Sequence, residues 1–126
     1  MTRELKLVYV VDDDESVRRS LDRLLKSAGF AVRTYDSASA FLADRAVHSG
    51  VCLVLDIKMP EMSGLELVEH MVDTGTDLPT ILITAVEEEL SQYQQPPVLA
   101  CLQKPFLKKD LLNLIEDGLS RQSRSK

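Results

Sequence analysis

Five short apolar runs divide the chain at intervals of about twenty to thirty residues. Each run is long enough for a β-strand and too short for a helix of ordinary length. The second run alternates apolar and polar residues only in part, which is typical of a strand near the edge of a sheet. The predicted strands are Leu5–Val11, Phe30–Tyr35, Val51–Leu55, Thr80–Ile83 and Val98–Leu102.

A stretch with helical spacing of apolar residues follows each predicted strand. Asp14 and the pair Ser63 and Glu66 have the residue types of helix N-caps, and Gly29 is suited to a helix end. The stretch before Pro96-Pro97 has only two apolar anchors, so we expect a short or irregular fourth helix there. The predicted helices lie within 17–28, 37–46, 65–72, 87–95 and 111–119.

The regular order of strand and helix, repeated five times, indicates an α/β fold. It predicts a parallel sheet with helices on both faces, joined by right-handed crossovers. A length of 126 residues fits one domain. We assign residues 1–120 to this domain and 121–126 to a polar tail or linker stub.

Composition narrows the classes of partner. The net charge is −5 and no broad basic face is evident, which argues against direct binding of nucleic acid by this domain. No apolar stretch approaches the length of a membrane span, and the first residues lack the apolar core of a secretory signal. We therefore expect a cytoplasmic protein without a membrane partner. Cys52 and Cys101 lie in predicted strands, which favours two buried thiols over a disulfide or a metal site.

Polar residues stand where four of the apolar runs stop. Because the carboxyl ends of parallel strands meet at one edge of a sheet, these residues are expected to form a common site. A structural cluster of ion pairs is the plain alternative, and the aspartate after the third strand, taken alone, could simply cap a turn. The residues at these ends are Asp12 and Asp13, Asp56, Thr84 and Lys104.

The residue types at this edge favour phosphoryl-group chemistry. Three carboxylates placed together repel one another unless a cation lies between them. Mg²⁺ takes oxygen ligands of this kind and keeps positions open for phosphate oxygens. With the ammonium of Lys104 and the hydroxyl of Thr84, the set has what transfer of a phosphoryl group to Asp56 requires: a carboxylate nucleophile and cations near the transferred oxygens.

Four segments carry a resemblance to a known family. VYVVDDDESVRRSL, LVLDIKMPEMSGLELV, ILITA and CLQKPF together resemble the receiver domain of two-component response regulators. The likeness covers about the first 120 residues. It is nearest to the subfamily of nitrogen-fixation and related regulators that carry a C-terminal helix-turn-helix. The resemblance implies a doubly wound, flavodoxin-like sheet with strand order 2-1-3-4-5.

The resemblance also implies roles at the acid cluster. Asp56 would be the phosphoacceptor. Asp12 and Asp13 would form the acid pair that holds Mg²⁺, with Asp13 the more direct ligand. Asp56 itself and the backbone carbonyl of Lys58 would complete the protein ligands, and Mn²⁺ would be able to substitute for Mg²⁺.

Two further residues and the partners follow from the same resemblance. Lys104 would bind a phosphoryl oxygen, next to a cis bond to Pro105, and Thr84 would move toward the phosphoryl group. The donor would be a phosphohistidine of a sensor histidine kinase, or a small acyl phosphate, and an output domain or downstream protein would read the signal. Such a domain is not an enzyme acting on other substrates, since it catalyses only its own phosphorylation and dephosphorylation. Homodimerisation on phosphorylation stays open.

One position departs from the family pattern and keeps alternatives open. Receivers usually have Tyr or Phe where this chain has Cys101, and a cysteine lacks the bulk for an aromatic switch. We therefore expect phosphorylation to reorder residues 86–97 instead, and a degenerate receiver that only binds partners remains an alternative. The spacing of Asp12 and Asp14 also resembles the nucleophile motif of haloacid-dehalogenase-type phosphatases, with Asp12 as nucleophile. That reading leaves the loop after Asp56 without a function.

Overall fold

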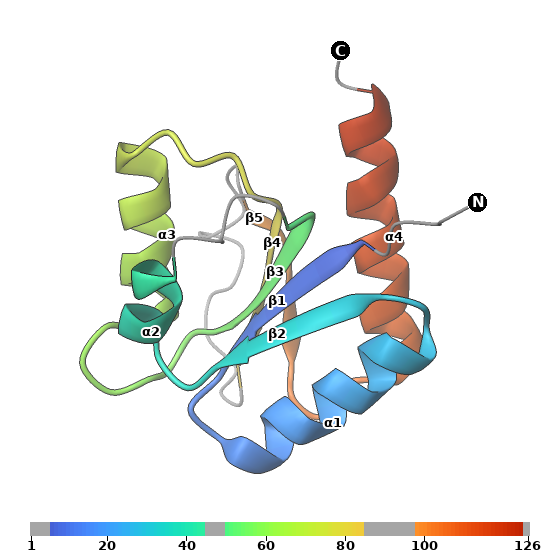
Figure 1. The fold of residues 1–126 in the computed structure, drawn as a ribbon, viewed down its shortest axis with the longest axis horizontal. Coiled ribbons are helices and arrows are strands. Elements are labelled where there is room, and N and C mark those ends of the chain that lie inside the picture. The colour runs from blue at the N-terminus through green and yellow to red at the C-terminus, as the bar shows by residue number, and fades with distance from the viewer. Residues whose placement is uncertain (1–5, 45–49, 85–97, 125–126) are drawn as a thin grey trace.

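The computed structural model of the protein describes residues 6–44, 50–84 and 98–124. Within these ranges five parallel strands form a sheet in the order β2-β1-β3-β4-β5 (Figure 1). This confirms the doubly wound fold and its predicted strand order. In chain order the elements are β1 (Leu7–Val11), α1 (Glu15–Ser27), β2 (Ala31–Tyr35), α2 (Ala38–Ala43), β3 (Cys52–Asp56), α3 (Gly64–Asp73), β4 (Thr80–Thr84), β5 (Val98–Gln103) and α4 (Lys108–Arg124). The expected helix at 87–95 lies outside the described residues.

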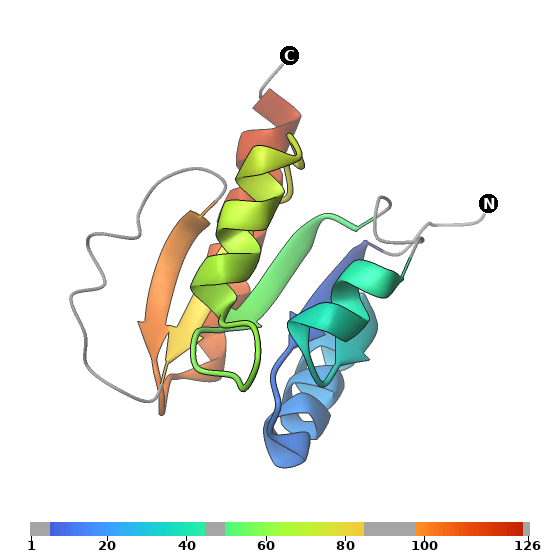
Figure 2. The same cartoon turned by 90° about the vertical axis from the view of Figure 1, so that its left-hand side faces the viewer.

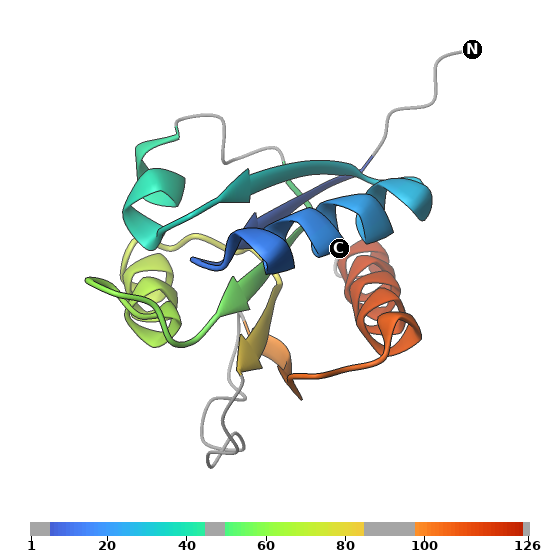
Figure 3. The same ribbon diagram turned by 90° about the horizontal axis from the view of Figure 1, so that it is seen from below.

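The sheet is the middle of three layers. Helices α2 and α3 cover one face, and α1 and α4 cover the other (Figures 2 and 3). Side chains alternate between the faces along each strand, so each strand contributes to two cores. The core under α2 and α3 includes Tyr9, Val11, Phe41, Leu53, Leu55, Leu67 and Met71, and the core under α1 and α4 includes Val8, Val10, Leu21, Leu25, Val54, Ile83, Leu111 and Ile115.

The two cysteines illustrate this alternation. Cys52 is buried in the core under α1 and α4, whereas Cys101 packs against the opposite core and is only partly buried. As predicted, the two thiols are not joined in a disulfide, because strand β4 lies between their strands and they face opposite sides of the sheet. The expectation of a fully buried thiol is right for Cys52 and wrong for Cys101.

The predicted caps start the helices next to the two acidic strand ends. The carboxylate of Asp14 accepts hydrogen bonds from the backbone N–H groups of Ser16 and Val17 at the start of α1. Ser63 and Glu66 form a reciprocal capping box at the start of α3. Both helices therefore begin at a fixed residue directly after the loop that follows a strand.

Two helix ends differ from the prediction. Helix α2 stops at Ala43 instead of Ala46, because Asp44 adopts an extended backbone and its carboxylate binds Tyr35 and Arg33 of strand β2. Helix α4 continues to Arg124, so the expected tail at 121–126 is helical for four residues. Residues 119–124 contain no proline or glycine to end the helix. In the described ranges, no helix has the length and apolar character of a membrane span.

Candidate functional site

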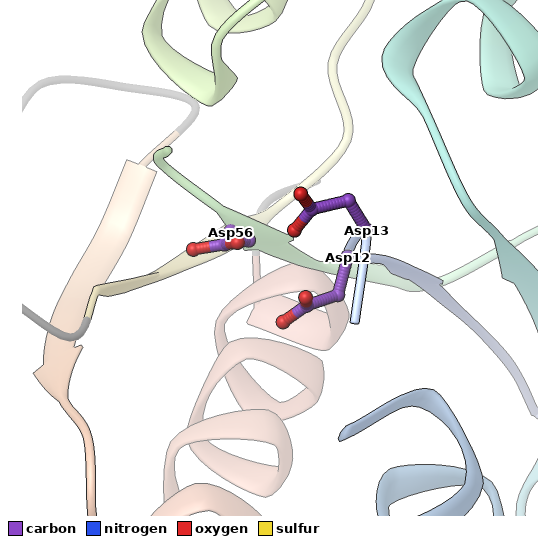
Figure 4. Close-up of side chains that lie close together, drawn as sticks. All are labelled: Asp12, Asp13 and Asp56. Atoms are coloured by element: carbon purple, nitrogen blue, oxygen red, sulfur yellow. The ribbon is translucent and has the colours of Figure 1, made fainter. Parts of the chain in front are cut away.

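The register of the sheet brings two acids side by side. Val11 of β1 pairs with Leu55 of β3, so the next residues along these strands, Asp12 and Asp56, are neighbours. With Asp13 they form a cluster in which one carboxylate oxygen from each residue lies within 4.8 Å of the other two (Figure 4). Asp12 and Asp56 are buried, and Asp13 is exposed. The three carboxylates expected to meet at this edge therefore do so.

The next two strands place the other polar residues at the same edge. Asp56 pairs with Ile83, so Thr84 lies one residue beyond this pair on β4, where it is fully buried. The carbonyl of Thr84 accepts a hydrogen bond of 2.7 Å from the backbone N–H of Lys104. This bond fixes the main chain of Lys104 against the end of β4. The Lys104–Pro105 peptide bond is cis, as the family resemblance implies.

The ammonium of Lys104 lies nearer to Asp12 than to Asp56. Its Nζ donates to Oδ2 of Asp12 at 3.0 Å and is 3.9 Å from Oδ1 of Asp56. The lysine side chain remains 23% exposed, so it is anchored without being enclosed. A cation of the protein thus lies next to two of the three acids, on the side that leads to β5.

Asp12 is held at every polar group that it carries. Its Oδ1 accepts from the backbone N–H of Asp14 at 2.9 Å, and its Oδ2 accepts from Lys104. Its own N–H donates to the carbonyl of Tyr35, and its carbonyl accepts from Nη1 of Arg18 at 2.8 Å. A fully buried carboxylate with these contacts is a fixed part of the framework and is badly placed to act as a nucleophile.

Asp56 is in a different electrostatic state. Its pKa is raised to about 6, first by burial and then by the negative charge of Asp12, with a smaller contribution from Asp13. The ammonium of Lys104 and a hydrogen bond from the backbone N–H of Lys58 act in the opposite direction and do not cancel the rise. Three carboxylates placed together offer the hard oxygen ligands that a divalent cation such as Mg²⁺ prefers. The cation would in turn offset the repulsion between their negative charges.

The loop after Asp56 returns closely to the end of its own strand. The backbone N–H of Gly64 donates to the carbonyl of Ile57 at 2.8 Å. A Cβ at position 64 would lie 2.4 Å from the carbonyl oxygen of Asp56 and 3.0 Å from Cα of Ile57, so only glycine fits there. Within the same loop Glu61 has a positive φ of 68°.

Two parts of the site go beyond, or differ from, what the sequence indicated. Lys58 was expected to act through its carbonyl, and the contact given by the structure is the one from its N–H to Asp56; the carbonyl role stays a prediction. The apolar spacing of α1 places Arg18 on the polar face of the helix, yet it is partly buried and binds the main chain of Asp12. Helical periodicity gives no signal for a side chain that reaches back six residues.

Most of the chain matches the model of one protein family. The family model described as the response regulator receiver domain matches residues 8–116. The transcriptional regulatory protein TdiR of Thauera aromatica is 38% identical over 122 residues, which are 94% of this chain and 53% of TdiR. The response regulator protein TmoT of Ectopseudomonas mendocina is 33% identical over 128 residues, covering all of this chain and 58% of TmoT. The chain thus spans little more than half the length of these relatives.

The fold of the chain is also similar to that of a solved structure. The crystal structure of FixJ-N superposes with a TM-score of 0.83 and 36% sequence identity, covering 94% of this chain and 96% of that one. The transcriptional regulatory protein FixJ of Bradyrhizobium diazoefficiens is 35% identical over 114 residues, which are 89% of this chain and 56% of FixJ.

Proposed function

The chain belongs to the response regulator receiver domains, in their FixJ-like subfamily, and we propose that Asp56 is the residue that accepts the phosphoryl group. Receiver domains are phosphoacceptor signalling modules and are generally not metabolic enzymes. The contacts in this chain support a separate role for each of several residues in that reaction.

One observation carries the assignment: three acids and one ammonium meet at the edge of the sheet, and only some of their oxygens are engaged. One carboxylate oxygen from each of Asp12, Asp13 and Asp56 lies within 4.8 Å of the other two, and Nζ of Lys104 is 3.0 Å from Asp12 and 3.9 Å from Asp56. Both oxygens of Asp12 accept hydrogen bonds from the protein. Asp56 keeps its weaker contact to the lysine and a raised pKa, so it is the better nucleophile.

The acid cluster also supports a divalent cation site. Asp12, Asp13, Asp56 and the backbone carbonyl of Lys58 would hold Mg²⁺, and Mn²⁺, which takes similar oxygen ligands, could replace it. When bound, the ion would offset negative charge on the phosphoryl oxygens. Burial, and next to it the negative charge of Asp12, raise the pKa of Asp56. This supports the assignment, because a cation between the acids would offset their negative charge.

Phosphoryl transfer would use Lys104 and Thr84, which lie at the same edge of the sheet as Asp56. A carboxylate oxygen of Asp56 attacks phosphorus while the phosphorus–nitrogen bond to the donor imidazole breaks, and the imidazole keeps the electron pair and takes up a proton. Lys104 releases Asp12 and donates to a phosphoryl oxygen, and Thr84 donates its hydroxyl hydrogen to another. Attack of water on the aspartyl phosphate later releases inorganic phosphate and restores the carboxylate.

The partners are assigned from the family and the relatives. The donor is a phosphohistidine of a sensor histidine kinase. The longer relatives include a transcriptional regulatory protein, TdiR, of which this chain covers 53%. We assign the output to a further domain or a downstream protein that controls transcription and that reads the phosphorylated state of this chain.

Phosphorylation of the purified chain tests the function. The chain is incubated with acetyl phosphate and Mg²⁺, its intact mass is measured, and the modified peptide is identified after borohydride reduction. We expect one added phosphoryl group on the peptide that contains Asp56, and none in Asp56→Asn or after removal of Mg²⁺ with EDTA. Label on the peptide that contains Asp12 would support the phosphatase alternative, and a wild-type chain without label would support the degenerate receiver.

A further inference from the structure

Arg18 reaches the acid cluster from helix α1, and none of the roles proposed above uses it. Its Nη1 donates to the carbonyl oxygen of Asp12 at 2.8 Å, and its own backbone N–H donates to the carbonyl of Asp14 at 3.0 Å. The side chain is partly buried, unlike that of its neighbour Arg19, which is 72% exposed and pairs with Glu15. One residue therefore binds the β1–α1 turn at two points.

The carbonyl that Arg18 binds needs a partner. Asp12 is fully buried. At the end of β1, its main-chain N–H donates to the carbonyl of Tyr35 on β2. A buried carbonyl left without a hydrogen bond destabilises the fold, because it has lost its bonds to water. The guanidinium supplies a charge-assisted bond, which is stronger than one from a neutral donor. The contact therefore fixes the direction of a specific peptide group.

That peptide joins Asp12 to Asp13, which makes it important for the acid cluster. The side chain of Asp12 has its own anchors in Lys104 and the N–H of Asp14. Asp13 is exposed, so the direction of its side chain depends on the peptide that precedes it. A rotation of this peptide would turn the carboxylate of Asp13 away from Asp56.

We propose that Arg18 is a positioning residue for the divalent cation, because it fixes the Asp12–Asp13 peptide and so keeps the carboxylate of Asp13 directed toward Asp56. The proposal rests on the metal role of Asp13 and Asp56 proposed above. The guanidinium of Arg18 binds the main-chain carbonyl oxygen of Asp12 and not its carboxylate. Arg18 therefore acts through placement rather than through its charge.

The sign of one measurement separates placement from charge. Loss of a positive residue near a cation site removes a Coulombic repulsion and therefore strengthens cation binding. Loss of a residue that places a ligand weakens it, typically by tenfold or more. Arg19 provides the matched control, because Arg19→Gln removes the same charge one residue further along α1 without touching the main chain of Asp12.

The experiment is a calorimetric titration of the whole chain with magnesium chloride. We expect Arg18→Gln to weaken Mg²⁺ binding about tenfold. Arg18→Lys, which keeps one donor with a shorter reach, should weaken it about threefold. Arg19→Gln should bind as tightly as wild type or more tightly. Without Mg²⁺, the amide hydrogen of Asp14, which donates to Asp12, should exchange faster in Arg18→Gln than in Arg19→Gln.

Equal Mg²⁺ affinity in Arg18→Gln and Arg19→Gln would overturn the proposal, even if Arg18→Gln were less stable in urea, because Arg18 would then only tie the helix. If Arg18→Gln does not fold, Arg18→Lys is judged by the same comparison. A wild-type chain that binds no Mg²⁺ would instead overturn the metal site in the proposed function. In that case amide exchange of Asp14 alone decides whether Arg18 orders the turn.

Discussion

The turns after strands β1 and β3 have the same plan and opposite electrostatics. Each follows a buried strand, carries a buried aspartate and leads into a capped helix. At the first turn, Asp12 is held by Lys104, by the N–H of Asp14 and by Arg18. At the second, Asp56 is 3.9 Å from the lysine and has a pKa raised to about 6.

This difference separates framework from chemistry. A carboxylate whose two oxygens both accept hydrogen bonds from the protein stabilises the fold and is a poor nucleophile. A carboxylate whose charge is left partly uncompensated costs stability in the resting protein, and a cation or a phosphoryl group can restore it. The two buried aspartates should therefore respond to substitution with opposite signs, which the following measurements test from the largest effect to the smallest.

Asp12→Ala should lower the free energy of unfolding by about 3 kcal/mol, because it leaves the N–H of Asp14 and the ammonium of Lys104 without their acceptor. Urea denaturation at neutral pH without Mg²⁺ measures the change. The control is Asp13→Ala, an exposed neighbour in the same cluster, for which we expect a change within about 0.5 kcal/mol. Similar losses in both variants would contradict the framework role of Asp12.

Asp56→Asn should raise the free energy of unfolding by about 2 kcal/mol at pH 7.5 without Mg²⁺. The pKa of Asp56 is raised to about 6 in the fold from 3.8, so the fold favours its protonated form. Its ionisation therefore costs stability progressively as the pH rises from about 4 through about 6. The advantage of asparagine should be complete above this range and absent below it. Urea denaturation of both proteins from pH 4 to 8 gives the difference curve.

A difference that does not depend on pH would show that the gain, if any, comes from packing rather than from the charge of Asp56. Mg²⁺ provides a second control. It should stabilise the wild-type protein more than Asp56→Asn, since the variant has lost a proposed ligand.

Ser63→Ala should lower the free energy of unfolding by about 1 kcal/mol, because Ser63 caps α3 through the N–H of Glu66. Unlike the cap of α1, whose N–H binds Asp12, this cap does not touch the acid cluster. Mg²⁺ affinity measured by calorimetry should therefore stay within about twofold of wild type. Ser27→Ala, at the exposed end of α1, is the control for loss of a hydroxyl and should cost less. A large loss of Mg²⁺ affinity in Ser63→Ala would mean that the two turns differ less than their contacts indicate.

Much of the site could be predicted because it depends on strand ends alone. The apolar runs locate the strands, parallel order brings their carboxyl ends to one edge, and the acids at those ends must then meet. Asp12, Asp13 and Asp56 needed no knowledge of side-chain contacts to be placed together. The order of the strands came from the resemblance, since alternation of strand and helix does not distinguish between doubly wound sheets.

The parts that could not be predicted depend on contacts between residues distant in sequence or on local main-chain geometry. The ammonium of Lys104 lies nearer to the carboxylate of Asp12 than to that of Asp56, and the two distances differ by less than 1 Å. Arg18 has the spacing of a solvent-facing residue and acts through a main-chain oxygen. The early end of α2 follows from the binding of Asp44 to Tyr35 and Arg33, which no helical pattern encodes.

Gly64 gives the second turn a mechanical property as well. With no side chain at this position, the first residue of α3 lies directly against the main chain of Asp56 and Ile57. There is no soft layer of side chains between them to absorb a displacement. We therefore expect that a shift of the β3 terminus on phosphorylation of Asp56 would move α3 as a whole helix, without the intervening loop as a relay.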